Sequence, residues 1–207
     1  MLRFYGSNAR PARNKKTKKG GDIIVDMSRR LKLFIVAFIL LLFLIISYIL
    51  YMEEQGNFHP ITIGEAYRSA QLDRDELEYY IKKYNIKSIL NLRGKNVDAP
   101  WYMEEMKVST EHNVIHYDSS IPASYEPSKE DIQKLIEIFK HAPRPILIHC
   151  QAGADRSGLV AAMWKVIVDK EPKSEAGKEL SILYGHIPIG RTSAIDRFFE
   201  NWRPELN

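Results

Sequence analysis

The feature that most constrains this chain is an apolar run of 19 residues, from Leu33 to Tyr51, with no charged residue, proline or glycine. At 1.5 Å per residue a helix of this length measures about 28 Å, close to the roughly 30 Å hydrocarbon core of a bilayer. A core helix of a soluble domain normally repeats a polar residue every three or four positions, and this run has only Ser47 and two tyrosines near its end. The run therefore predicts a transmembrane helix over residues 33–51, through which the chain contacts a membrane.

A cleaved signal peptide is the closest alternative, because basic residues also precede the apolar part of such a peptide. The run is long for that role, and so are the 32 residues before it. Residues 51–56, which follow the run, offer no A-x-A-like cleavage site. An uncleaved signal anchor is the better interpretation.

The charges on the two sides of the run differ in sign. Residues 1–32 hold ten Lys or Arg and two Asp or Glu, whereas residues 52–207 hold 20 and 24. Because Lys and Arg next to a span stay on the cytoplasmic side, we expect residues 1–32 to form a disordered cytoplasmic tail. The domain over residues 52–207 then faces outward, into the periplasm of a Gram-negative bacterium. A basic tail also suits nucleic acid, but its place beside a membrane explains the charge, and no nucleic-acid partner is expected.

Residues 52–207 alternate between short apolar runs and helical patterns, which predicts an α/β domain with a mostly parallel central sheet flanked by helices. We expect a hairpin over residues 58–69, strands over 88–92, 114–117 and 145–149, and helices over 73–84, 101–111, 128–141 and 157–169, with two more from 174 and 193. Asp73 and Ser128 open capping-box-like sequences at two of these helices. The single cysteine, Cys150, excludes an internal disulfide and a cysteine-based metal cluster, and no metal or cofactor is predicted.

The residues that carry chemistry lie where the apolar strand 145–149 ends and the next helix begins. Cys150 and Arg156 are separated there by five residues, with Gly153 between them. A short loop before a helix can aim several backbone N–H groups at one point, and the positive end of the helix dipole favours an anion. The same field stabilises a thiolate, while a guanidinium binds two phosphate oxygens at once. The pattern predicts a phosphate-binding loop with a nucleophilic cysteine, whereas a buried inert cysteine is the alternative.

The segment from His149 to Gly158 resembles the H-C-x-x-G-x-x-R-S-G signature of the cysteine-dependent protein tyrosine phosphatase superfamily. The lead-in over residues 66–71 resembles the compact dual-specificity branch, especially its exported or membrane-anchored bacterial members. The resemblance spans roughly residues 57–207. It implies that Cys150 is the nucleophile that forms a phosphocysteine, that Arg156 clamps the phosphate, and that Ser157 assists departure of the thiolate. The residues expected to surround the phosphate are Gln151, Ala152, Gly153, Ala154, Asp155 and Arg156.

The mechanism that the resemblance implies also needs an acid to protonate the leaving oxygen. In the compact branch this acid is an aspartate after a strand, roughly thirty residues before the cysteine, and Asp118 occupies that place. Asp155 is the alternative, because some lipid-directed branches carry an aspartate at that loop position.

The expected substrate is a phosphorylated protein, with phosphotyrosine or phosphoserine and phosphothreonine as the hydrolysed groups. A phospholipid or glycolipid phosphate is the second choice. Two interpretations without phosphate hydrolysis stay open: a pseudophosphatase that only binds phosphorylated ligands, and a rhodanese-like sulfurtransferase. The intact Cys150, Arg156 and Asp118 set favours the hydrolase.

Overall fold

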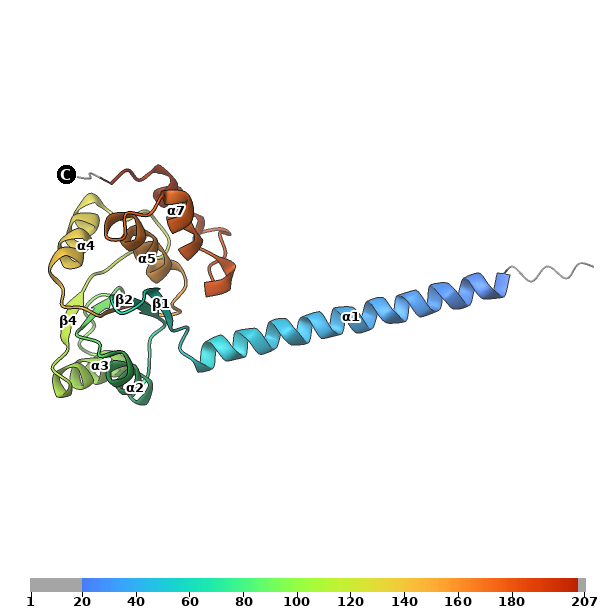
Figure 1. Cartoon of the computed structure of the whole chain (residues 1–207), viewed down its shortest axis with the longest axis horizontal. Helices are drawn as coiled ribbons and strands as arrows, with labels where there is room; N and C mark the ends of the chain where they lie inside the picture. The colour runs from blue at the N-terminus through green and yellow to red at the C-terminus, as the bar shows by residue number, and fades with distance from the viewer. Residues whose placement is uncertain (1–19, 205–207) are drawn as a thin grey trace, which may run out of the picture. The chain divides into compact units, whose positions relative to one another are not determined.

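The computed structural model describes the backbone of residues 20–204 and the side chains from Arg29 onward. The chain divides into a first compact unit that ends at Ile49 and a second that begins at Leu50. Helix α1 (Gly20–Glu54) extends beyond the apolar run at both ends (Figure 1). Residues 20–32 of the predicted disordered tail are thus helical, because a formed helix gains one hydrogen bond for each residue added. Residues 1–19 of that tail lie outside the described residues.

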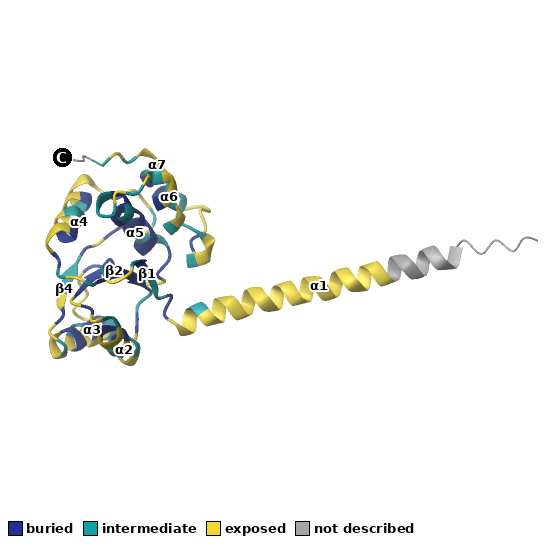
Figure 2. Cartoon of the chain, in the orientation of Figure 1, coloured by how far each residue is buried: buried dark blue, intermediate teal, exposed yellow. Residues whose placement is uncertain are grey.

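The stretch Arg29–Glu54 of α1 is long and apolar enough to cross a membrane. Its side chains are exposed from Arg29 to Tyr51 (Figure 2). A signal sequence near an N-terminus meets the same two criteria of length and composition. The direction of crossing stays a prediction from the charge bias.

The second unit is built on a five-stranded sheet with the order β1-β2-β5-β3-β4. Its strands are β1 (His59–Thr62), β2 (Ala66–Ser69), β3 (Ser88–Asn91), β4 (Ile115–Asp118) and β5 (Ile146–His149). Strand β1 pairs with β2 antiparallel, which is the predicted hairpin, and the other pairs are parallel. The predicted α/β fold with a mostly parallel central sheet is confirmed.

Helices cover both faces of this sheet (Figure 1). Helices α2 (Arg74–Tyr84) and α3 (Pro100–Glu111) lie on one face. The other face carries α4 (Lys129–His141), α5 (Asp155–Ile167), α6 (Lys173–Ala176) and α7 (Ser193–Asn201), with short 3₁₀ turns η1 (Gly177–Glu179) and η2 (Ile182–Tyr184) before α7. Side chains alternate along a strand, so Ile146 and Ile148 of β5 join the core under α5, while Leu147 joins the core under α2.

Both predicted helix starts are confirmed in detail. The side chain of Asp73 accepts from the Glu76 N–H while the Glu76 carboxylate accepts from the Asp73 N–H, and Ser128 and Asp131 do the same before α4. Helix α5 begins two residues earlier than predicted, because Asp155 and Arg156 belong to its first turn. The helix predicted from residue 174 is only four residues long and passes into a 3₁₀ turn at Gly177, a residue with a low helix propensity.

Candidate active site

Polar residues gather at the carboxyl ends of the parallel strands. The strand register places Ser69 beside His149, His149 beside Asn91, and Asn91 beside Asp118. Cys150 follows His149 directly. In an open α/β sheet, ligands bind in the crevice outside this edge. Asp118 and Cys150 therefore stand at the same edge, two strand spacings apart, which is roughly 10 Å at about 4.8 Å per spacing.

The Cys150 thiol lies at the base of the loop that joins β5 to α5. The residue is 3% exposed, and its Sγ is 3.5 Å from the Ser157 Oγ on the first turn of α5. No side chain caps the N-terminus of α5, so the first N–H groups of that helix have no side-chain acceptor there. These groups and the helix dipole favour a negative charge at the loop, whether on sulfur or on a bound oxyanion.

Three consecutive carbonyl groups of the loop are bound by buried side chains behind it. The Nδ2 of Asn57 donates to the Ala152 carbonyl at 3.0 Å. One nitrogen of Arg68 donates to the carbonyls of Gly153 and Ala154, each at 2.9 Å. In a trans peptide the C=O and the following N–H point in opposite directions. The N–H groups after these carbonyls therefore point away from Arg68 and Asn57, as an anion-binding loop requires.

Two glycines let this support approach the loop. Gly153 has φ +69°, and a Cβ there would lie 2.6 Å from the backbone nitrogen of Ala70. A Cβ at Gly158 would lie 3.0 Å from the guanidinium of Arg68. Any larger residue at Gly153 would have to move the loop away from strand β2. Gly153 thus permits both the positive φ of the loop and its contact with β2.

Arg68 is fully buried in strand β2. Its second terminal nitrogen lies 2.8 Å from the Glu179 carboxylate and 2.8 Å from the Glu179 carbonyl, and its guanidinium lies over the Tyr184 ring, 4.5 Å from the centroid. Burial lowers the pKa of Arg68, while Glu179 acts to raise it. Because a buried charge needs a partner, Glu179 makes this position tolerable for an arginine. The arginine in turn fixes the loop carbonyls.

Two further guanidiniums lie at the site without an acidic partner. Arg156 donates to the Leu92 carbonyl at 3.3 Å, and Arg93 donates to Gln71 at 3.0 Å and stacks on Trp101 at 3.6 Å. Burial, and next the positive charge of Arg156, lower the pKa of Arg93. Within residues 29–204 neither arginine forms a salt bridge. A bound phosphate would relieve the repulsion between them, so the pair marks an anion site.

A buried carboxylate beneath the loop holds His149. Glu105 of α3 is 4% exposed and accepts from His116 at 2.7 Å, from His149 at 3.2 Å and from Gln71 at 2.7 Å. Burial acts to raise the pKa of Glu105, but the charge and hydrogen bonds of His149, with those of His116 and Gln71, lower it well below its usual range. The other ring nitrogen of His149 is 3.3 Å from the Cys150 carbonyl. This network ties α3 to His149 and, through the His149 ring, to the backbone of Cys150.

Asp118 is held at the end of β4 by two donors. Asn91 donates to one carboxylate oxygen at 2.9 Å and the hydroxyl of Tyr102 donates to the other at 2.7 Å. Burial and the bond to Asp118 raise the pKa of Tyr102 to about 12, so this hydroxyl remains a donor in neutral solution. The Asp118 side chain is 25% exposed. It is thus oriented by the protein and still open to a ligand.

Asp155, the alternative acid, is engaged elsewhere. Its carboxylate is 2.7 Å from a ring nitrogen of His186, which is buried in the segment after η2. Gln151 and Ala152 are exposed at the mouth of the loop, whereas Ala154 is buried.

The structure brings the predicted residues from Cys150 to Ser157 together and places Asp118 on the same sheet edge. Roles for Asn57, Arg68, Arg93, Glu105 and His186 were not expected from the sequence. For Arg68, a charged residue inside a short buried strand was an available signal. For Asn57 and Glu105 no local pattern distinguishes these residues from their neighbours. Among the described residues, no group of three or more His, Cys, Asp or Glu side chains is arranged to hold a metal ion.

The sequence and the fold both match known proteins. The family described as DSP-PTPase phosphatase fused to NAD+ kinase matches residues 62–194. The dual specificity protein phosphatase CDC14B of Mus musculus is 28% identical over 79 residues, which are 38% of this chain and 15% of that protein. The chain spans 15% and 11% of the lengths of the curated relatives that it matches.

Two solved structures share the fold of the second unit. The catalytic core of the PP-IP phosphatase SIW14 from S. cerevisiae superposes with a TM-score of 0.60 at 22% identity, covering 72% of this chain and 87% of that one. TpbA of P. aeruginosa superposes with a TM-score of 0.57 at 20% identity, covering 71% and 85%. At these identities the two structures establish the fold.

Proposed function

The chain belongs to the compact dual-specificity-like branch of the cysteine-dependent protein tyrosine phosphatase superfamily, and from this premise we propose that it hydrolyses phosphate monoesters through a phosphocysteine on Cys150. The observation that carries the proposal is the loop itself. A thiol stands at an uncapped helix N-terminus, inside a loop whose carbonyls are bound from behind, with two unpaired guanidiniums beside it. Within residues 29–204, no acidic residue forms a salt bridge with either guanidinium.

In the first step the Cys150 thiolate attacks phosphorus and the bond from phosphorus to the ester oxygen breaks. Arg156 and the loop N–H groups bind the equatorial oxygens, where charge accumulates in the transition state. Asp118 gives its proton to the departing oxygen. In the second step water attacks phosphorus, Asp118 takes a proton from that water, and the sulfur leaves as thiolate. The Ser157 hydroxyl, 3.5 Å from the sulfur, donates to the thiolate as it leaves.

We propose phosphorylated proteins as the substrate class. The loop between Cys150 and Arg156 contains Asp155 and no lysine. One phosphate dianion suits the guanidiniums of Arg156 and Arg93, whereas a ligand with several phosphates would need further cations, and the loop itself supplies no lysine. The PP-IP specificity named for SIW14 is therefore less suited to this loop.

A lipid phosphate is the second candidate, and one observation favours it. The segment after η1 exposes four large aliphatic side chains next to the loop: Ile182, Leu183, Ile187 and Ile189. The Tyr184 carbonyl within this segment accepts from Asn57, which also binds the loop. An apolar rim of this kind suits a substrate carried by a membrane. We propose in addition that residues 33–51 anchor the chain, with the N-terminus cytoplasmic and the second unit outward.

The nucleophile is tested with the full-length chain and its Cys150→Ser variant. Cys150→Ser should abolish phosphate release from an aryl phosphate, because a serine hydroxyl is hardly ionised, and should retain binding of an oxyanion. Activity that survives in Cys150→Ser contradicts the phosphocysteine. For the unmodified chain, thiocyanate formation from thiosulfate and cyanide, without phosphate release, would favour the sulfurtransferase. Oxyanion binding by the unmodified chain without turnover would favour the pseudophosphatase.

The acid is tested by the leaving group. Asp118→Asn should lower kcat by about 10²–10⁴ for an alkyl phosphate or phosphoserine, the usual worth of general acid catalysis, and by much less for an activated aryl phosphate. Asp155→Asn is the matched control and should not show this dependence on the leaving group. The reverse outcome assigns the acid to Asp155. Comparing phosphopeptides with phospholipid vesicles in the same assay separates the two substrate classes.

A further inference from the structure

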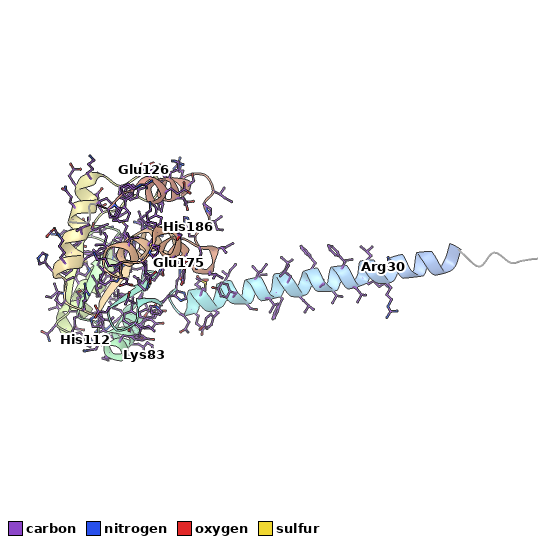
Figure 3. The ribbon with its side chains drawn as sticks, turned by 45° about the horizontal axis from the view of Figure 1, so that its top comes forward. Arg30, Lys83, His112, Glu126, Glu175 and His186 are labelled. Carbon is purple, nitrogen blue, oxygen red and sulfur yellow. The ribbon has the colours of Figure 1, made fainter. Side chains whose placement is uncertain are left out.

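His186 lies beside the candidate site and connects two carboxylates (labelled in Figure 3). The residue is 1% exposed. Its Nδ1 is 2.7 Å from an oxygen of Asp155, and its Nε2 is 3.0 and 3.2 Å from the two oxygens of Asp196. An ionised carboxylate only accepts hydrogen bonds, and histidine carries a proton on both nitrogens only as imidazolium. Both contacts are therefore satisfied together when His186 is positively charged.

The charge matters because of where Asp155 stands. It directly precedes Arg156 in the first turn of α5, so its carboxylate belongs to the segment that must accept a phosphate dianion. A carboxylate there repels the ligand unless a positive charge neutralises it. The imidazolium of His186 is the group in contact with it.

The charged groups that contact His186 come from two packed elements. Asp155 lies on α5 and Asp196 on α7. The hydrogen bond to Asp155, reinforced by Asp196 and opposed by burial, raises the pKa of His186 above its usual value of 6.5. The imidazolium therefore persists to a higher pH than that of an ordinary histidine side chain.

We propose that His186 is a positioning residue for phosphate binding, which as an imidazolium neutralises Asp155 and holds its carboxylate against a buried ring. The inference rests on the proposed phosphate site. Through His186, the segment 181–192 controls the charge that the loop presents to its ligand.

The first test uses sulfate and the full-length Cys150→Ser chain in detergent. Sulfate is a dianion at every pH used, and the serine removes the titration of the thiol, so neither obscures the result. Sulfate affinity is measured by calorimetry from pH 6 to pH 9. It should fall about tenfold as His186 loses its proton, because one compensating charge near the dianion is then lost. An affinity that is constant over this range overturns the proposal, and this test needs no change at His186.

The second test separates charge from mere structure with a double-variant cycle in the same background. His186→Gln should weaken sulfate binding about tenfold at pH 7. Adding Asp155→Asn to His186→Gln should restore the affinity, because the carboxylate that repels the dianion is then gone, and Asp155→Asn alone completes the cycle. A purely structural role for His186 predicts the opposite, because the double variant would then bind no better than His186→Gln. His141→Gln, at an exposed histidine, is the control and should change nothing.

The outcomes also separate this inference from the proposed function. A Cys150→Ser chain that is folded and binds no sulfate at any pH contradicts the phosphate site itself. Sulfate binding that is independent of pH and of His186 leaves the phosphate site intact and refutes only the role of His186.

Discussion

Replacing Glu105 by glutamine tests the buried network under the candidate nucleophile. One Glu105 oxygen accepts from His116 and His149, and the other accepts from Gln71. Each histidine nitrogen must carry a proton in these contacts, because a carboxylate has none to give. The glutamine side chain at position 105 must turn its NH₂ either toward the two histidine N–H groups or toward the NH₂ of Gln71. The Gln71 oxygen is not free to receive it, because that oxygen already accepts from Arg93. As long as the two histidine nitrogens that face this position keep their protons, every orientation leaves buried donors facing each other.

The expected cost follows from burial. Glu105 is 4% exposed, so the network has little access to water. Removing one partner from a buried charged network costs about 3–5 kcal/mol. We therefore expect Glu105→Gln to lower the free energy of unfolding by that amount. Glu104→Gln, the adjacent exposed residue on the same helix, should change it by less than about 0.5 kcal/mol.

The sign of the pH dependence gives an independent check. The pKa of Glu105 is lowered on folding, so its carboxylate contributes stability above its unfolded pKa of about 4.3. That contribution is lost as the pH falls through the folded pKa. The difference between the wild-type chain and Glu105→Gln should thus be largest at neutral pH and shrink in acid.

The assay is urea unfolding followed by tryptophan fluorescence, because Trp101, Trp164 and Trp202 all belong to the second unit. A difference that is below about 1 kcal/mol at pH 7, equal to that of Glu104→Gln, or larger in acid than at neutral pH would contradict a stabilising role of the Glu105 carboxylate.

The remaining predictions use the same chain. Gly153→Ala should lower the free energy of unfolding by at least about 2 kcal/mol, because of the positive φ and the clash with β2. Gly190 has a similar φ but open space around it, so Gly190→Ala should show only the backbone cost. Equal losses of the two variants in urea unfolding would contradict the clash. Arg156→Lys should lower kcat/KM by about 10²–10³, because an ammonium cannot replace the two-pronged guanidinium. Arg191→Lys is the control and should leave kcat/KM unchanged. A loss of less than tenfold for Arg156→Lys in a phosphate-release assay argues against the clamp. A cytoplasmic reporter should be active when fused before residue 33 and silent after residue 207, and replacing the basic residues of 29–32 should weaken this orientation; the inverse pattern overturns the outward assignment.

Local patterns determined most of the fold. The capping sequences at Asp73 and Ser128, the apolar run before Cys150 and the hairpin over residues 58–69 each depend on interactions within a few residues, so the sequence alone predicts the elements that they begin or join. The alternation of strands and helices then leaves a parallel sheet as the consistent arrangement. The exact ends differ where a residue suits two structures, as with Asp155, which fits a loop and also the first turn of a helix.

The chemistry expected of one short segment follows from local sequence, because Cys150, Gly153 and Arg156 lie within a few residues of one another in a loop that local geometry shapes. The support of that loop depends instead on contacts that form only in the folded chain. Arg68 binds the loop carbonyls across 85 and 86 residues, Glu105 reaches His149 across 44, and His186 reaches Asp155 across 31. No local pattern encodes such pairs, since each is a buried charge that becomes favourable only when folding supplies its partner.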